Sequence, residues 1–388
     1  MKKVVKDMQK LHIVQQNANT WECCRMLDGV NEIHQSTYNL REKRVKYWQT
    51  SKWHRTRAME ALRQSQATIG FKSSIGEDNV IIVLPYLQLN MATSNFGEKN
   101  LIGKFQFGRV FRGVRAGKKV TVKIWETIKG ENVYDEANEL RLRDEISLLQ
   151  HPDLLSHPNV VKMIGYSLDE GKIGAVYDLD PQDSLYNLAP KDEFSWLQRM
   201  KVIYEFANLL VYLHAATPPH LPYRVGNIDA AHIILDKEYS PKFVDFGMTV
   251  GGIILSTRAS RMKRLWARMG YIDMDEGNHF EARDIFGFGC IILCLIHKRV
   301  PSVDFIPRIE VEEDHEEHLR SGNSNGFSYV HKSLKGEQGF NENDGVEITK
   351  LGRECVDICA WQRPSMEDVV KRLKKLHVIK KMGIKKLH

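Results

Sequence analysis

The chain has 388 residues, of which 42% are hydrophobic, so it is long enough for one large two-lobed domain with an extension. Its best apolar run, residues 290–296, is far shorter than the roughly 18–20 residues that span a bilayer, which argues against a membrane-spanning helix. The formal net charge is +7, and the six scattered cysteines have no metal-ligand spacing, which argues against a zinc site.

The first 66 residues are rich in Lys, Arg, Gln, Met and Leu, and they begin without the apolar core of a signal peptide. Apolar side chains such as Trp48 and Leu62 recur among basic ones, a pattern that predicts two or three amphipathic helices. We therefore expect a basic helical extension over residues 1–66. Residues 67–87 are expected to form a linker that includes a short apolar strand.

A glycine-containing turn follows at residues 103–110, which read GKFQFGRV. Glycine lets a hairpin backbone close over a bound group. Residues 120–123, VTVK, alternate as a strand does, and residues 135–150 predict a helix that carries several carboxylates. This part of the chain therefore predicts a small sheet with one major helix.

The middle of the chain predicts a change to longer helices. Residues 174–179, GAVYDL, predict a strand, and residues 196–214 predict a long amphipathic helix that ends before two prolines. Residues 233–247 read IILDKEYSPKFVDFG, which predicts two short strands joined by a polar turn and followed by Asp-Phe-Gly.

In this order the motifs resemble those of the plant receptor-like cytoplasmic kinases, a family of the protein kinase superfamily. The resemblance covers residues 88–377. It implies an α+β, bilobal protein kinase fold, with a small β-rich N-terminal lobe and a large helical C-terminal lobe. Residues 378–388 would then form a basic C-terminal tail.

The resemblance also implies an ATP site. Lys123 would contact the phosphates and Glu145 would hold that lysine, with Glu139 and Asp144 as alternative partners. Tyr177 would be the gatekeeper beside the adenine. The residues expected at the ATP site are Ile102, Gly103, Gly108, Val110, Lys123, Glu145, Asp178 and Leu179, the last two through backbone groups.

The chemistry of the site departs from the family pattern. Asn227 stands at the position of the catalytic base, and an amide cannot accept the substrate proton. Asp245 would be a metal ligand, but His232 replaces the metal-binding asparagine, and Mg²⁺ prefers oxygen ligands. Asp229 is the carboxylate in this loop that could substitute as the base.

Two further departures lie on the expected walls of the ATP site. Phe105 replaces the middle glycine of the loop, where a benzyl group would either obstruct the phosphates or cap the pocket. Thr121 replaces the small alanine that lies against adenine in the family, which we expect to be a mild change.

The C-terminal part predicts a buried helix beginning near Asp284 and long polar loops over residues 301–345. Residues 371–388 carry 8 Lys and Arg and no acid, with Leu373, Leu376 and Ile379 at helical spacing. Such a helix either lies on an anionic membrane or is the last helix of the domain with a solvated back.

Charge gathers at the two ends of the chain, since residues 1–66 also carry 13 Lys and Arg against 6 Asp and Glu. Basic ends on a more acidic body favour contact with anionic lipid or an acidic partner over contact with nucleic acid. The alternative is a pair of solvated helical faces.

The altered loop is similar to that of the pseudokinase adaptors of plant immune receptor complexes. We expect a pseudokinase that retains an ATP site and acts as an adaptor, and the loss of the asparagine weakens the case for Mg²⁺ or Mn²⁺. The resemblance implies other protein kinases or immune receptors as partners, in the cytoplasm or at the plasma membrane. The alternatives are an active Ser/Thr kinase that uses Asp229, and a membrane-surface scaffold.

Overall fold

The structure is a computed structural model that describes most of the chain beyond residue 79. The described residues are 80–105, 107–126, 134–169, 171–215, 221–252, 270–271, 280–302, 304–322 and 326–383. The predicted extension 1–66, most of the predicted linker and residues 384–388 of the predicted tail lie outside them.

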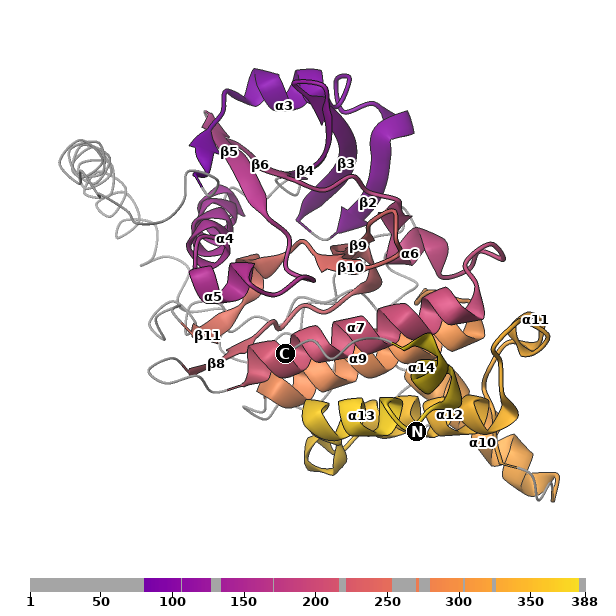
Figure 1. Cartoon of the computed structure of the whole chain (residues 1–388). Coiled ribbons are helices and arrows are strands. Elements are labelled where there is room, and N and C mark those ends of the chain that lie inside the picture. Colours follow the sequence, from indigo (N-terminus) through magenta and orange to yellow (C-terminus); the bar gives the residue numbers. More distant parts are fainter. Residues whose placement is uncertain are drawn as a thin grey trace, which may run out of the picture. The chain divides into compact units, whose positions relative to one another are not determined.

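The first lobe is a six-stranded sheet with a helix, α4, against it (Figure 1). The order of the strands is β1-β5-β6-β4-β3-β2, antiparallel except for the pair β1 and β5. The strands are β1 (Ile82–Val83), β2 (Leu101–Phe105), β3 (Gly108–Arg115), β4 (Lys118–Trp125), β5 (Met163–Asp169) and β6 (Lys172–Tyr177). The helices are α3 (Tyr86–Ala92), η2 (Glu98–Asn100), α4 (Tyr134–Leu149) and α5 (Pro152–Leu155).

Strand β4 shows why the alternating sequence matters. Side chains of a strand point alternately to the two faces of its sheet. Val120, Val122 and Ile124 pack into a small core on the outer face, with Leu89 and Phe111. Thr121, Lys123 and Trp125 point to the other face, which turns toward the second lobe.

The second lobe is mainly helical, with α7 and α9 side by side at its centre (Figure 1). Its helices are α6 (Leu185–Leu188), α7 (Trp196–His214), α9 (Phe280–His297), α10 (Pro307–Arg320), α11 (Lys332–Lys335), α12 (Glu342–Cys355), α13 (Met366–Leu373) and α14 (His377–Met382). Short strands pair as β7 (Asp183–Ser184), β9 (Ile233–Leu235) and β10 (Pro241–Phe243), and as β8 (Leu221–Arg224) with β11 (Val250–Gly252). Single turns are η3 (Ala230–His232), η4 (Phe246–Met248) and η6 (Ala360–Gln362).

Helix α7 begins at a capping box. The Ser195 hydroxyl accepts from the Gln198 N–H, and the Gln198 side chain accepts from the Ser195 N–H. One turn later, Arg199 is fully buried, and its guanidinium donates to the carbonyls of Phe194, Ala189, Leu295 and Lys191 at 2.7–2.8 Å. A buried arginine therefore joins the start of α7 to the end of α9.

The prediction of long loops over residues 301–345 is wrong, because α10, α11 and the start of α12 lie there. Helix α10 buries only Pro307 and Val311, and charged residues cover most of its surface. A helix with so narrow an apolar face lacks the periodic signal that a sequence reading needs.

The end of the described chain packs against the second lobe. Leu373, Leu376 and Ile379 belong to the main hydrophobic core. The Asp344 carboxylate accepts from the backbone N–H groups of His377 and Val378, both at 2.8 Å, and so caps the start of α14. The structure confirms a last helix of the domain at residues 371–377 and extends it to α14, with Lys374, Lys375, Lys380 and Lys381 exposed.

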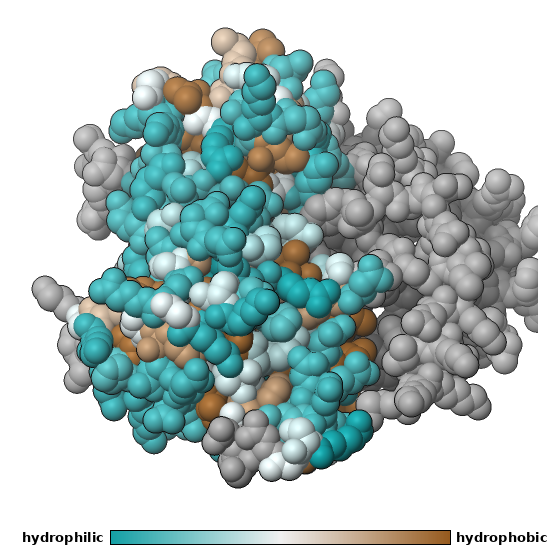
Figure 2. All heavy atoms as spheres, turned by 90° about the vertical axis from the view of Figure 1, so that its right-hand side faces the viewer, coloured by the Kyte–Doolittle hydropathy of each residue, from teal (hydrophilic) through white to brown (hydrophobic). Residues whose placement is uncertain are grey.

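The surface is largely hydrophilic in the view of Figure 2, where hydrophobic residues form small, separate groups. Within the described residues, no helix combines the length and apolar character needed to cross a bilayer.

Candidate functional site: the cleft between the lobes

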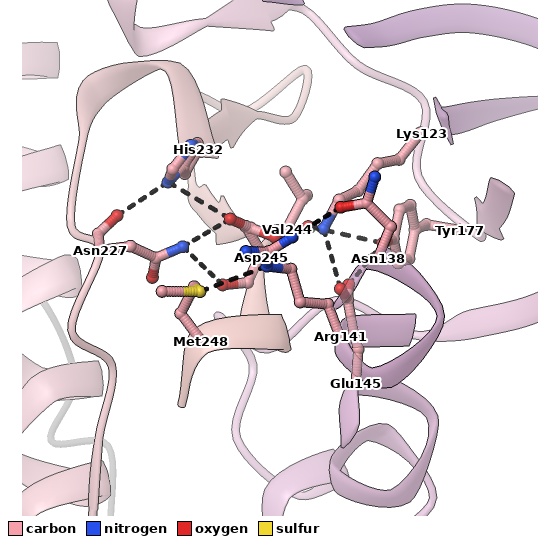
Figure 3. A network of polar contacts seen from close by, with 10 residues as sticks. All are labelled: Lys123, Asn138, Arg141, Glu145, Tyr177, Asn227, His232, Val244, Asp245 and Met248. Atoms are coloured by element: carbon pink, nitrogen blue, oxygen red, sulfur yellow. Dashed lines mark hydrogen bonds and ion pairs between the residues drawn. The ribbon is translucent and has the colours of Figure 1, made fainter. Parts of the chain in front are cut away.

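Lys123 stands at the centre of a buried polar network between the two lobes (Figure 3). Its ammonium donates to Glu145 Oε2 at 2.8 Å, to the Val244 carbonyl at 3.1 Å, and to the Asp245 carboxylate. Lys123 and Glu145 are 0% exposed and Asp245 is 2% exposed. The structure thus brings the predicted lysine, its predicted glutamate and the Asp-Phe-Gly aspartate together, with one cation between two carboxylates.

Glu145 has an unusual environment on α4. Burial raises its pKa to about 7, although the neighbouring Lys123 lowers it. The Tyr177 hydroxyl donates to Glu145 Oε1 at 2.5 Å. Burial and this carboxylate together raise the pKa of Tyr177 well above its ordinary range, so the hydroxyl keeps its proton and remains a donor.

Asp245 is held by donors on both of its oxygens. Burial alone would raise its pKa, but Lys123 foremost, then His232 and Arg141, outweigh that effect and hold the pKa below its ordinary value. Lys123 donates to Oδ1, and the Asn227 amide donates to Oδ2 at 2.5 Å. Asp245 is therefore ionised at neutral pH.

His232, which stands at the predicted degenerate metal position, is hydrogen-bonded to the backbone. Its Nδ1 donates to the Asn227 carbonyl at 2.7 Å, which requires a hydrogen on that nitrogen, and the same nitrogen lies 3.7 Å from Asp245 Oδ2. A protonated nitrogen cannot bind a metal ion. In this arrangement the nitrogen of His232 that lies near Asp245 is not a metal ligand, and the lone pair is on the buried Nε2.

Asp229 also serves the backbone. Its carboxylate accepts from the Ala231 N–H at 2.8 Å and caps η3, and the residue is 5% exposed. The carboxylate that the sequence suggested as a substitute base is thus used to shape the loop.

Four of the predicted ATP-site positions, at and beside the glycine-containing turn, have structural roles. A Cβ at Gly108 would lie 1.8 Å from the Ile124 carbonyl, so glycine is needed for β3 to approach β4. Ile102 and Val110 are buried in the main core, and Gly103 packs near the Ala231 carbonyl.

The backbone groups of the predicted hinge residues form hydrogen bonds within the chain. The Asp178 N–H donates to the Lys162 carbonyl, and the Leu179 N–H donates to the Tyr177 carbonyl, both at 2.9 Å. The Leu179 carbonyl accepts from the Thr121 hydroxyl at 3.0 Å. Thr121, which we expected to be a mild change, is therefore bonded directly to the hinge.

Asp284 is a buried residue that braces the loop before Asn227, a role that the sequence alone did not assign. Its carboxylate accepts from the N–H groups of Val225 and Gly226 at 2.8 and 2.7 Å and contacts His214 Nε2 at 3.0 Å. Gly226 has φ +77°, a conformation that favours glycine. A carboxylate next to the apolar run of α9 was the available signal, since a buried charge needs partners.

Comparison with known proteins decides the family. A family profile described as "Protein kinase domain" matches residues 96–373. The chain belongs to the protein kinase family. The match falls inside the predicted range 88–377, and the motifs and bilobal fold agree with it.

The relatives of this kinase-family chain are plant proteins of the receptor-like cytoplasmic kinase type and plant receptor kinases. It is 28% identical to "Probable serine/threonine-protein kinase PBL7" of Arabidopsis thaliana over 71% of each chain. It is 24% identical to "PTI1-like tyrosine-protein kinase 2" of the same plant over 92% of this chain and 95% of the relative. "LRR receptor kinase SERK2" of Oryza sativa subsp. japonica is 28% identical over 80% of this chain, which spans about half (52%) of that receptor.

Protein kinases use ATP with Mg²⁺ or Mn²⁺, so the family implies a site for both. The residues of this kinase-family chain do not fit them in the arrangement described. The Lys123 ammonium, which would meet the phosphates, is bonded to three acceptors, and His232 turns a protonated nitrogen toward Asp245. In the described ranges, no cluster of three or more His, Cys, Asp or Glu could hold a metal ion.

Proposed function

We propose that this kinase-family chain is a pseudokinase, which keeps the fold but does not transfer phosphoryl groups at an appreciable rate. The observation that carries the proposal is the hydrogen bond from the Asn227 amide to Asp245 Oδ2. A kinase base accepts the proton of the substrate hydroxyl as the phosphoryl group moves. The residue at that position here is a donor, and it donates to the aspartate of Asp-Phe-Gly.

The orientation of the Asn227 amide follows from charge. Asp245 is ionised, and a carboxylate accepts hydrogen bonds but cannot donate them. The NH₂ group of Asn227 must therefore face it, because the amide oxygen would be repelled. This role of Asn227 supports a structural use of the former base position.

The alternative, an active kinase that uses Asp229, has less support. Its carboxylate already accepts from the Ala231 N–H, and it is buried. To serve as the base it would have to release the turn η3 that it caps and reach the substrate hydroxyl.

The partner proposal rests on the preserved frame. The core that joins the lobes is continuous and includes Phe246 of the Asp-Phe-Gly motif and Leu149 of α4. A stable kinase-shaped body without the chemistry suits an adaptor that binds other protein kinases or immune receptors. Lys374, Lys375, Lys380 and Lys381 are exposed and would suit an anionic membrane surface, which would place the adaptor at the plasma membrane.

The test is a phosphoryl-transfer assay on the full chain. We would measure transfer of the γ-phosphate of ATP, with Mg²⁺ or Mn²⁺, to the chain itself and to a generic protein substrate. We expect the unmodified chain to match an Asp245→Asn variant prepared in the same way, at least about 10³-fold below an established Ser/Thr kinase.

The Asp245→Asn variant is the matched control for a contaminating kinase, because a contaminant would label both preparations equally. Transfer by the unmodified chain that is lost in both Asp245→Asn and Asp229→Asn would overturn the proposal and favour the active kinase.

A further inference from the structure

The adenine end of the cleft is occupied by bonds of the chain itself. Thr121 on β4 and Leu179 after β6 are both buried, and the Thr121 hydroxyl donates to the Leu179 carbonyl at 3.0 Å. The Leu179 N–H donates to the Tyr177 carbonyl. The Leu179 N–H is therefore satisfied inside the chain, and an adenine would have to break that bond to pair with it. The Thr121 hydroxyl occupies one of the two lone pairs of the Leu179 carbonyl, on the side from which the Thr121 side chain approaches.

The phosphate end is occupied by Phe105. This side chain is only 5% exposed, and its ring stands nearly perpendicular (85°) to the His232 ring with the centroids 5.5 Å apart. The Lys123 ammonium lies 5.2 Å from the centre of the same ring. The benzyl group thus reaches from β2 to the loop of the second lobe, across the space in which phosphates would approach Lys123.

Strand β2 and its neighbour β3 are also tied to the second lobe. The Ile102 carbonyl accepts from the Asn187 side chain at 3.0 Å. Arg112 donates to the Gln182 carbonyl at 2.5 Å and lies 3.6 Å from Asp183. To admit a triphosphate, β2 would have to lift from these contacts and expose Phe105 to water.

The charges of the network also oppose the binding of a nucleotide. Lys123 is already paired with Asp245 and Glu145, and a nucleotide would add several negative charges beside these two carboxylates. Each polar bond that the nucleotide displaced would also have to be replaced. ATP therefore competes with a cleft whose polar groups already have partners.

From this geometry we propose that Phe105 and Thr121 exclude ATP from the cleft, by taking the places of the phosphates and of the adenine contact. Excluding the nucleotide deepens the pseudokinase proposal and rests on it. Under this proposal, contacts of the chain itself join the lobes across the cleft, and the side chains of Phe105 and Thr121 prevent nucleotides from binding there.

The experiment measures binding of ATP to the full chain, with and without Mg²⁺, by thermal shift and by a fluorescent ATP analogue. We expect no shift for the unmodified chain. We expect the Phe105→Ala, Thr121→Ala double variant to gain a shift of more than about 3 °C, because the cleft is then open at both ends. Adding Lys123→Met to the double variant should remove the gain.

Phe111→Ala is the matched control. Phe111 is as buried as Phe105, but it packs in the small core on the outer face of the sheet. Its truncation opens a similar void away from the cleft and should bring no nucleotide binding. Equal gains in Phe105→Ala and Phe111→Ala would overturn the proposal.

Binding of ATP by the unmodified chain would also overturn it, and this measurement does not depend on a variant that folds. A folded double variant that fails to bind ATP would likewise count against it. ATP binding without phosphoryl transfer would defeat this inference and leave the pseudokinase proposal intact, whereas phosphoryl transfer would defeat both.

Discussion

At the scale of single residues, Glu145 shows how burial changes the ion pair of a kinase lysine and its glutamate. Its carboxylate is shared between the Lys123 ammonium and the Tyr177 hydroxyl, with no exposure to water. Burial raises its pKa to about 7 from an ordinary value of 4.5. The protonation of this one group therefore links the stability of the cleft to pH.

The sign of the dependence follows from proton binding. Between about pH 4.5 and about pH 7 the folded chain holds a proton on Glu145 that the unfolded chain has released. The contribution of this group to stability is thus complete at lower pH and is lost as the pH rises through about 7. We expect Glu145→Gln, which cannot ionise, to lack this decline.

The measurement is urea unfolding of the unmodified chain and of Glu145→Gln at a series of pH values. The difference in free energy of unfolding should change by at most about 3 kcal/mol between about pH 5 and about pH 8, in favour of the variant at the higher pH. Glu139→Gln on the same helix, where Glu139 pairs with Arg143, is the control and should follow the unmodified chain. Parallel pH profiles for all three proteins would contradict the assignment.

At the scale of elements, Arg199 explains how α7 and α9 are joined. Its guanidinium, at the start of α7, donates to the Ala189 carbonyl directly after α6 and to the Leu295 carbonyl near the end of α9. Burial lowers the pKa of Arg199 to about 10, which still leaves it charged at neutral pH. A flat, five-donor group suits this role better than any other side chain.

We expect Arg199→Met to lower the free energy of unfolding by about 3 kcal/mol or more, because it leaves several buried carbonyls without donors. The free energy of unfolding of Arg199→Lys should fall between those of the unmodified chain and Arg199→Met, because an ammonium cannot reach all four acceptors. Urea unfolding measures both.

The control for α7 is Arg143→Met on α4. Arg143 is 38% exposed in its side chain and pairs with Glu139, so its loss should cost no more than about 1 kcal/mol. If Arg199→Met were as stable as Arg143→Met, the four hydrogen bonds would not contribute as argued.

At the scale of the whole molecule, Lys123 joins the two lobes. It comes from β4 of the first lobe, and it bonds to Val244 and Asp245 of the second. Removing the ammonium leaves the buried Asp245 carboxylate charged and without its cation, which costs more than the ion pair itself contributes. The lysine that kinases use to hold ATP thus acts here as a bond between lobes.

Lys123→Met should lower the free energy of unfolding by about 3–5 kcal/mol at neutral pH. Adding Glu145→Gln and Asp245→Asn to the same chain should recover part of the loss, because no unpaired charge then remains. Chemical denaturation of the three proteins, with the coincidence of fluorescence and circular dichroism as a check of cooperativity, measures this.

Lys119→Met is the control on the same strand. Lys119 is 64% exposed in its side chain and lies 3.3 Å from Asp180, so its removal should cost no more than about 1 kcal/mol. A loss as small as this in Lys123→Met would show that the network does not hold the lobes together.

The sequence by itself predicted the family and the bilobal fold, and it placed an asparagine where the resemblance expects the base. These features depend on local patterns: the alternation of β4, the capping box of α7, and the ordered motifs around Lys123 and Asp245. It failed at α10, whose polar surface carries no periodic signal.

Only the tertiary structure decided what the altered residues do instead. The partners of Thr121, Phe105 and Asn227 lie on other segments: Leu179, His232 and Asp245. Side-chain contacts between distant segments depend on how the elements pack, and spacing along the chain does not specify that packing. The sequence could therefore say which chemical groups are missing, whereas the fold showed which partners the residues in their places contact.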